Sequence, residues 1–120
     1  MAKQYNKSSK NNQEVYTQLA ELDGIAPPQS IELEQAVLGA LMLEKDAIID
    51  VQEYLSVDTF YTEEHRTIFK AIQDLSFEMK AIDLYTVTER LKAQKELTKV
   101  GGAAYLAELT QRVATAAHVE

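Results

Sequence analysis

"PPQSIELEQAVLGALML", residues 27–43, decides the fold because it joins helix-start signals to apolar residues at helical spacing. Ser30 follows the two prolines and is the expected N-cap, and Glu32 and Glu34 suit the positive end of a helix dipole. One apolar stripe recurs at the helical period, at Leu33, Ala36, Val37, Ala40 and Leu41. A second stripe consists of Ile31, Leu38 and Met42. We therefore expect this helix to be the buried centre of the protein.

Gly39 lies in the middle of the predicted helix. Glycine at such a position costs about 1 kcal/mol relative to alanine, so a packing reason is needed. We infer a close crossing with another helix at Gly39.

Four further helices are predicted downstream. Asp46, Thr62 and Asp83 are the expected caps of the first three. Each of the four helices has one apolar face. In chain order these faces consist of Ile48, Val51 and Leu55; of His65, Ile68, Phe69, Ile72, Leu75 and Met79; of Leu84, Val87 and Leu91; and of Leu106, Leu109 and Val113. "AIDLYTV", residues 81–87, is the one stretch that could be argued as a strand. The pattern predicts an all-α, compact bundle of about five to six helices.

Length and composition indicate one domain, since 120 residues that are 46% hydrophobic suffice for a single core. Residues 1–26 are expected to be a polar tail, disordered or weakly helical, with a short helix at 14–22. Lys3, Lys7 and Lys10 make this tail basic, and a solvated terminus is its favoured interpretation. The folded domain is expected at 27–120. With no cysteine and no apolar run near the ~18 residues of a membrane helix, we expect a cytoplasmic protein without membrane contact.

The net charge of −7 is spread unevenly. Between Pro27 and His65 the only basic residue is Lys45. The acidic residues of this stretch are Glu32, Glu34, Glu44, Asp46, Asp50, Glu53, Asp58, Glu63 and Glu64. Such a surface repels phosphate backbones, so the domain should not grip DNA by itself. A solvated acidic face is the first interpretation, and a face for a basic protein partner is the second.

"VGGAAYLAEL", residues 100–109, raises the possibility of a phosphate-binding glycine loop. A P-loop needs GxxxxGK[ST], and the residues after Gly101 and Gly102 supply neither the lysine nor the hydroxyl. A dinucleotide fingerprint lacks its third glycine. We expect Gly101 to end one segment in a left-handed conformation and Gly102 to begin the next.

"FYTEEHRTIF", residues 60–69, places Glu64 beside His65. Consecutive helical residues point in different directions, so these two cannot converge on one metal ion. His65 is spaced with the apolar face of its helix and is expected to be half-buried and hydrogen-bonded within the fold. With two histidines and no cysteine, no nucleophile arrangement can be argued. We predict no catalytic, cofactor or metal site in this chain.

Five stretches together resemble the N-terminal domain of bacterial replicative DNA helicases of the DnaB type. They are "PPQSIELEQAVLGALML", "DTFYTEEHRTIFKAI", "IDLYTVTERL", "VGGAAYLAEL" and "TAAHVE", and the match runs from about Pro27 to Glu120. The resemblance implies an all-helical collar domain above a hexamer of ATPase domains. It also implies that ATP, magnesium and the DNA-translocating loops belong to a C-terminal domain that is absent here.

The resemblance implies a non-catalytic domain whose partners are primase and sister helicase subunits, with a helicase loader as a further candidate. Tyr105 and Leu97 are the candidate partner-binding residues, because the stretch between them is the nearest retained part of the family's primase-docking surface. For Tyr105 the competing interpretation is packing beside Leu109, one turn on. The alternative function is that of a free-standing helical protein-protein adaptor.

In the family a helical hairpin pairs neighbouring subunits, and this chain stops at Glu120, where its first helix would start. We therefore expect the 120-residue chain to sediment as a monomer or weak dimer in analytical ultracentrifugation. A stable hexamer would contradict this expectation.

Overall fold

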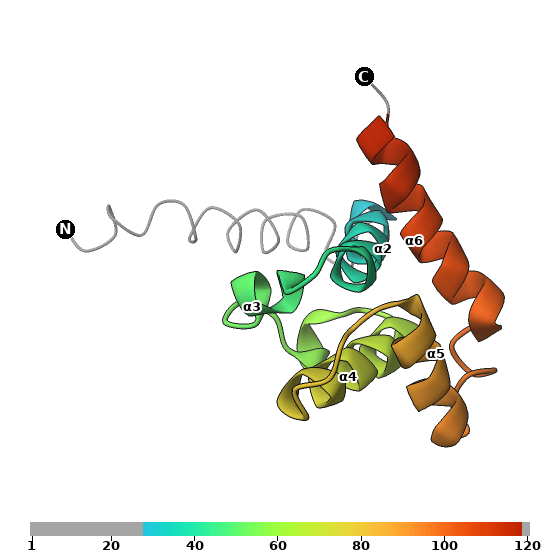
Figure 1. Ribbon diagram of the computed structural model, residues 1–120. Helices are drawn as coiled ribbons and strands as arrows, with labels where there is room; N and C mark the ends of the chain where they lie inside the picture. Colours follow the sequence, from blue (N-terminus) through green and yellow to red (C-terminus); the bar gives the residue numbers. More distant parts are fainter. Residues whose placement is uncertain (1–27, 119–120) are drawn as a thin grey trace.

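A computed structural model of the protein describes residues 28–118, and the side chains of residues 31–116. This part contains five α-helices, one 3-10 helix and no strand, which confirms the all-α prediction (Figure 1). The elements are α2 (Pro28–Leu43), α3 (Ala47–Val51), η2 (Val57–Thr59), α4 (Glu63–Phe77), α5 (Leu84–Ala93) and α6 (Gly102–His118). The tail expected at residues 1–26, with its short helix at 14–22, lies outside the described residues.

Helix α2 is the central element, as predicted, because it contacts α3, α4, α5 and α6. Figure 1 shows α6 running beside α2 on one side and α3 near it on the other, with α4 and α5 forming the rest of the domain. The helix begins at Pro28, two residues before the expected N-cap Ser30. The fixed φ of proline suits the first helical turn, so Pro28 starts the helix instead of preceding it.

The core face of α2 combines residues of both predicted stripes. Leu38 and Met42 of the second stripe are buried, and so is Leu41 of the first, while Val37 packs against the core. In the first stripe Leu33 is 41% exposed and Ala36 is also exposed. The helix is central as predicted, but it is not buried on every side. Both stripes are apolar, so the sequence pattern alone does not show which of their residues the neighbouring helices cover.

The close crossing predicted at Gly39 is confirmed. A Cβ added there would overlap the backbone oxygen of Leu109 on α6 and lie 2.8 Å from Val113 Cγ2. Backbone atoms cannot move aside as the end of a flexible side chain can. Gly39 therefore allows α2 and α6 to approach each other through their backbones.

Two of the three predicted caps form. Thr62 Oγ1 accepts a hydrogen bond from the backbone N–H of His65 at 3.1 Å. The Asp83 carboxylate accepts from the N–H of Thr86 at 2.8 Å, and the Thr86 hydroxyl oxygen accepts from the N–H of Asp83 at 2.9 Å. Residues 81–87 were the one stretch that could be interpreted as a strand. Residues 84–87 instead form the first turn of α5.

Asp46 does not cap α3 through its side chain, contrary to the prediction. Its backbone is left-handed, with a φ of 65°, and its side chain makes no capping hydrogen bond. An N-cap residue normally has an extended backbone that brings its side chain over the first helical N–H groups. Asp46 instead makes the sharp turn from α2 into α3.

Met79 does not lie on the core face of α4, where the spacing placed it. Helix α4 ends at Phe77, and Met79 is left-handed, with a φ of 59°, and 91% exposed. The N–H of Lys80 donates to the carbonyl of Leu75 at 2.9 Å, and that of Met79 to Ser76 at 3.0 Å. This pair of bonds is a Schellman motif, in which a residue other than glycine here takes the left-handed position.

The Gly39→Ala variant tests the backbone crossing. Alanine normally stabilises a helix relative to glycine, but here the added methyl group should lower the free energy of unfolding by about 1–3 kcal/mol or more. Chemical denaturation followed by circular dichroism measures this change. Ala103→Ser, which also adds one heavy atom at an exposed helical position, should change it by about 0.5 kcal/mol or less. A Gly39→Ala variant as stable as the parent would contradict the crossing.

Candidate partner-binding site

The two candidate partner-binding residues and the glycine pair lie at the junction between α5 and α6, with Leu97 in the connecting turn and Tyr105 near the start of α6. Gly101 and Gly102 have φ values of 111° and 79°, and Gly102 is the first residue of α6. The N–H of Gly102 donates to the carbonyl of Leu97 at 2.9 Å, which closes the turn. A Cβ at Gly101 would lie 2.8 Å from that of Tyr105. The prediction that this pair ends one segment and begins the next is confirmed.

Leu97 and Tyr105 are both half-buried, and both pack against the core. Each therefore has a fixed position in the fold and still reaches the surface. Tyr105 also lines a cleft of about 330 Å³ with Thr98, Gly101 and Glu64. The two residues thus flank the tight turn that precedes α6.

The hydroxyl of Tyr105 belongs to a chain of hydrogen bonds that enters the core. It lies 2.7 Å from Nε2 of His65 on α4 and 3.1 Å from Nε2 of Gln35 on α2. The rings of Tyr105 and His65 are nearly parallel, with an angle of 7° and centroids 6.0 Å apart. His65 is hydrogen-bonded within the fold as predicted, and at 2% exposure it is buried more deeply than expected.

The donor and acceptor of each hydrogen bond in this network can be assigned by starting from Arg112 at the surface. Arg112 can only donate, and its Nη1 donates to Oε1 of Gln35 at 3.2 Å. The Gln35 amide nitrogen therefore faces Tyr105 and donates to its oxygen. If the Tyr105 hydroxyl donates to Nε2 of His65, the neutral imidazole carries its hydrogen on Nδ1, which faces Glu34.

Glu34 is the hydrogen-bond partner of His65 Nδ1 at the buried end of this network. Its Oε1 lies 2.7 Å from Nδ1 of His65, and its Oε2 accepts from the backbone N–H of Tyr61 at 2.7 Å. Glu34 is 1% exposed. The expected interaction of Glu32 and Glu34 with the helix dipole was wrong, because α2 begins at Pro28 and both residues lie beyond its first turn. The missed signal was the spacing of Glu34, since it lies one turn before Leu38 on the face that became the core.

The network is a structural one. In the described part of the chain, no buried side-chain nitrogen or oxygen lacks a hydrogen-bond partner. Glu64, the neighbour considered for metal binding, is exposed, and the bonds of His65 go to other helices. Among residues 28–118 no group of three acidic or histidine side chains could hold a metal ion. The arrangement joins α2, α4 and α6 and offers no exposed reactive group.

Burial raises the pKa of the Tyr105 hydroxyl above its ordinary value, and the hydrogen bond from Gln35 partly offsets this effect. A tyrosine hydroxyl keeps its proton at neutral pH even at its ordinary pKa, so Tyr105 can donate to His65. The tyrosine is thus an anchored side chain, with its polar end in the interior and part of its ring at the surface.

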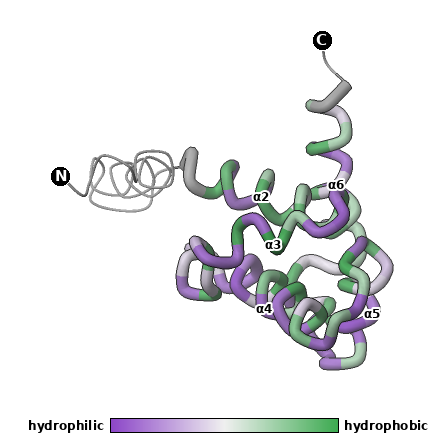
Figure 2. Tube along the Cα trace, turned by 60° about the vertical axis from the view of Figure 1, so that its left-hand side comes forward, coloured by the Kyte–Doolittle hydropathy of each residue, from purple (hydrophilic) through white to green (hydrophobic). Residues whose placement is uncertain are grey.

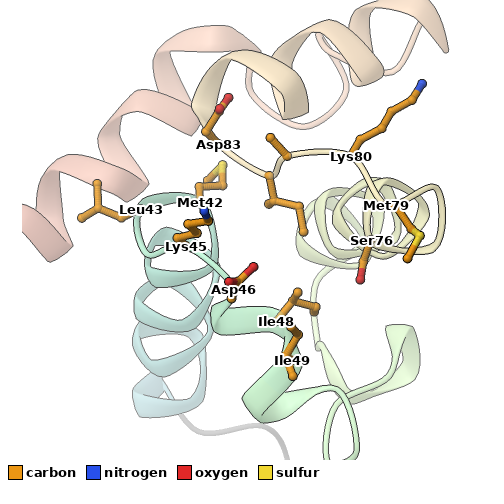
Figure 3. A pocket seen from close by; sticks show the side chains of 12 residues that line it. Met42, Leu43, Lys45, Asp46, Ile48, Ile49, Ser76, Met79, Lys80 and Asp83 are labelled. Atoms are coloured by element: carbon orange, nitrogen blue, oxygen red, sulfur yellow. The ribbon is translucent and has the colours of Figure 1, made fainter.

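A second cleft, of about 540 Å³, lies where α2, α3 and α4 meet (Figure 3). Met42 and Leu43 reach it from the end of α2, Ile48 and Ile49 from α3, and Met79 from the segment after α4. Its rim carries charges of both signs. The surface of this cleft is partly apolar and partly polar, and neither Leu97 nor Tyr105 lines it.

The acidic region keeps its character in the folded domain. Of the nine acidic residues between Pro27 and His65, all except Glu34 are exposed. Lys45 remains their single basic neighbour in that stretch. One of them, Glu63, pairs with Lys99, whose Nζ lies 3.5 Å from its carboxylate.

The described residues define an all-helical domain. A family model described as "DnaB-like helicase N terminal domain" matches residues 26–120, and the chain therefore belongs to that family. The matched region is the N-terminal domain and not the catalytic part of these helicases. No helix among residues 28–118 is long and apolar enough to cross a bilayer.

Curated relatives and a solved structure agree with the family match. The chain is 50% identical over 97 residues to the replicative DNA helicase DnaB of Rhodothermus marinus, covering 81% of this chain and 10% of that protein. It is 46% identical over 94 residues to DnaB of Geobacillus stearothermophilus, covering 78% and 21%. The crystal structure of the N-terminal domain of DnaB helicase from Mycobacterium tuberculosis superposes with a TM-score of 0.67 at 41% identity, covering 71% of this chain and 59% of that one. The chain thus spans about a tenth to a fifth of these relatives' full length.

The Tyr105→Phe variant tests the hydrogen-bond chain. It keeps the ring but leaves Nε2 of His65 without its donor, so the free energy of unfolding should fall by about 1–3 kcal/mol. Urea denaturation measures the change. Tyr85→Phe is the matched control, because Tyr85 is 71% exposed, and its effect should stay within about 0.5 kcal/mol. Equal effects of the two variants would argue against the network.

Proposed function

We propose that this domain is a non-catalytic assembly and primase-docking part of a replicative DNA helicase. Residues 27–120 form the proposed collar domain. ATP hydrolysis, with its magnesium ion, and DNA translocation are assigned to a separate C-terminal domain of the full-length, hexameric enzyme. The protein is proposed to act in the cytoplasm.

The observation that carries the proposal is the likeness to the N-terminal domain of a DnaB helicase, at 41% identity and a TM-score of 0.67. Membership in the helicase family favours this function over that of a free-standing adaptor. The exposed acidic residues also support partners other than DNA, because they repel phosphate groups. The proposed partners are therefore proteins: primase, sister subunits and a helicase loader.

Tyr105 and Leu97 are the proposed contacts for primase. An anchored tyrosine loses little conformational entropy on binding, since its hydroxyl is already held by His65 and Gln35. Leu97 adds a half-buried apolar side chain on the preceding turn. Tyrosine is one of the residues most often found as an anchor of protein interfaces, so Tyr105 is the main proposed contact.

Titration of the purified primase C-terminal domain into the full 120-residue chain, by isothermal calorimetry, tests the proposal. Tyr105→Ala should weaken binding by about tenfold or more, as expected for an interface anchor worth at least ~1.4 kcal/mol. Tyr85→Ala removes an exposed tyrosine from α5 and should leave the affinity unchanged. Circular dichroism confirms that each variant is folded at the titration temperature.

A second variant separates docking from stability. Thr98→Arg adds bulk at an exposed position between the two proposed contacts and leaves the hydrogen-bond chain intact. It should also weaken primase binding. If neither Tyr105→Ala nor Thr98→Arg reduced the affinity, or if the parent chain bound no primase, the proposed docking site would be wrong.

A further inference from the structure

The cleft between α2, α3 and α4 has an apolar lining that reaches from the core to solvent (Figure 3). Its inner part consists of side chains that belong to the core or pack against it, namely Met42, Ile48 and Ile82. Two further apolar residues of the lining face solvent, because Ile49 is 57% and Met79 is 91% exposed. Isolated apolar side chains are common on protein surfaces, but apolar groups gathered in one cleft indicate a binding surface.

Met79 occupies a backbone position that glycine would stabilise. Its φ of 59° is left-handed, and glycine adopts this conformation at a helix end without steric cost. Because the Met79 side chain is almost fully exposed, contacts within the described part of the chain do not offset that cost. Stability alone therefore gives no reason for a methionine here. Contact with another molecule would supply one, and the flexible, polarisable methionine side chain suits such contacts.

Carboxylates outnumber free basic groups around the cleft. Of the two lysines that line it, Lys80 lies 3.2 Å from the carboxylate of Glu78, which leaves Lys45. The exposed carboxylates that line the cleft or lie on the segments beside it belong to Glu44, Asp46, Asp50, Glu53 and Asp83. Among residues 31–116 no ion pair involves these five. In Figure 2, hydrophobic parts of the tube near α2 and α3 likewise adjoin hydrophilic ones. A partner that is apolar at its centre and basic at its edge would complement this surface.

The cleft favours a helical partner over an extended one. Residues 28–118 contain no strand, so they offer no sheet edge to which an extended segment could add. Against the apolar lining, an extended segment would leave its own N–H and C=O groups without partners, whereas a helix pairs these groups internally. An amphipathic helix also presents apolar side chains on one face, which is the usual way in which a helix fills an apolar groove.

We propose that this cleft docks an amphipathic helix of a protein partner. The apolar face of that helix packs against Met42, Ile49 and Met79, and lysine or arginine side chains along its edge face the carboxylates beside α3. The cleft is lined by neither Leu97 nor Tyr105. The inference therefore does not rest on the proposed primase-docking function, and the domain would bind two partners through separate sites.

Titration of the ¹⁵N-labelled full chain with a synthetic peptide tests the proposal. The peptide forms a helix of leucine and lysine, with leucine at spacings of three and four residues. The amide NMR signals of Ile49, Asp50 and Met79 should shift, whereas those of Glu108 and Arg112 on α6 should not. The same peptide with glutamate in place of lysine should bind about tenfold more weakly or worse, because its charges repel the carboxylates.

Two glycine variants separate binding from stability. Met79→Gly removes the exposed side chain after α4, and Lys95→Gly removes an exposed polar side chain at the equivalent position after α5, where φ is 61°. Both should keep or raise the midpoint of thermal unfolding, since glycine suits this backbone conformation. Met79→Gly should weaken binding of the lysine peptide by about fivefold or more, and Lys95→Gly should change it by about twofold or less.

A second pair of variants tests the charges. Asp46→Asn removes a carboxylate that lines the cleft, and asparagine also adopts the left-handed backbone of this residue readily. It should weaken binding of the lysine peptide. Asp58→Asn makes the same change at an exposed position of η2 that does not line the cleft, and it should have a smaller effect.

The proposal is overturned if the signals of Ile49 and Met79 do not shift, if the lysine and glutamate peptides bind equally well, or if Met79→Gly binds as tightly as the parent. A second copy of the chain is the competing occupant. It predicts that the signals of Ile49 and Met79 shift when the protein is diluted without peptide. Such a shift would assign the cleft to self-association and would also overturn the proposal.

Discussion

The close approach of α2 and α6 at Gly39 sets the rotation of α2, and the other contacts of the domain follow from that rotation. Gly39 lies against the backbone of Leu109, where any side chain would overlap it. Successive helical residues point about 100° apart, so fixing one position fixes them all. Glu34 is thereby placed beside His65 on α4, and Gln35 beside Tyr105 on α6. At the neighbouring position, Leu33 is left partly exposed.

This rotation explains why a carboxylate is buried where a leucine is not. Exposing part of a leucine costs little, whereas a buried carboxylate is tolerated only with hydrogen-bond partners for both oxygens. His65 and the backbone of Tyr61 supply those partners. Removing one member would leave a buried polar group unpaired, so the network holds three helices in one arrangement. The start of α6, and with it the surface at Tyr105, is positioned through the same bonds.

The sequence predicted the features that depend on local chemistry. Thr62 and Asp83 cap their helices through side chains close along the chain, and Gly39 and Gly101 stand where their lack of a Cβ is needed. It did not predict which residues of the two α2 stripes are buried, because both stripes are apolar and burial depends on packing with α4 and α6. Glu34 was missed for that reason, since it pairs with His65, 31 residues away.

The candidate site was predictable to a similar extent. The burial and hydrogen bonding of His65 followed from its spacing with Ile68 and Phe69. The anchoring of Tyr105 did not, because its partners come from two other helices. Even so, the two interpretations of Tyr105, packing within the fold and contact with a partner, are compatible. A side chain held at its polar end by the core presents its remaining surface in one orientation, and such rigidity favours an interface contact. Packing within the fold is then the means by which Tyr105 would recognise a partner.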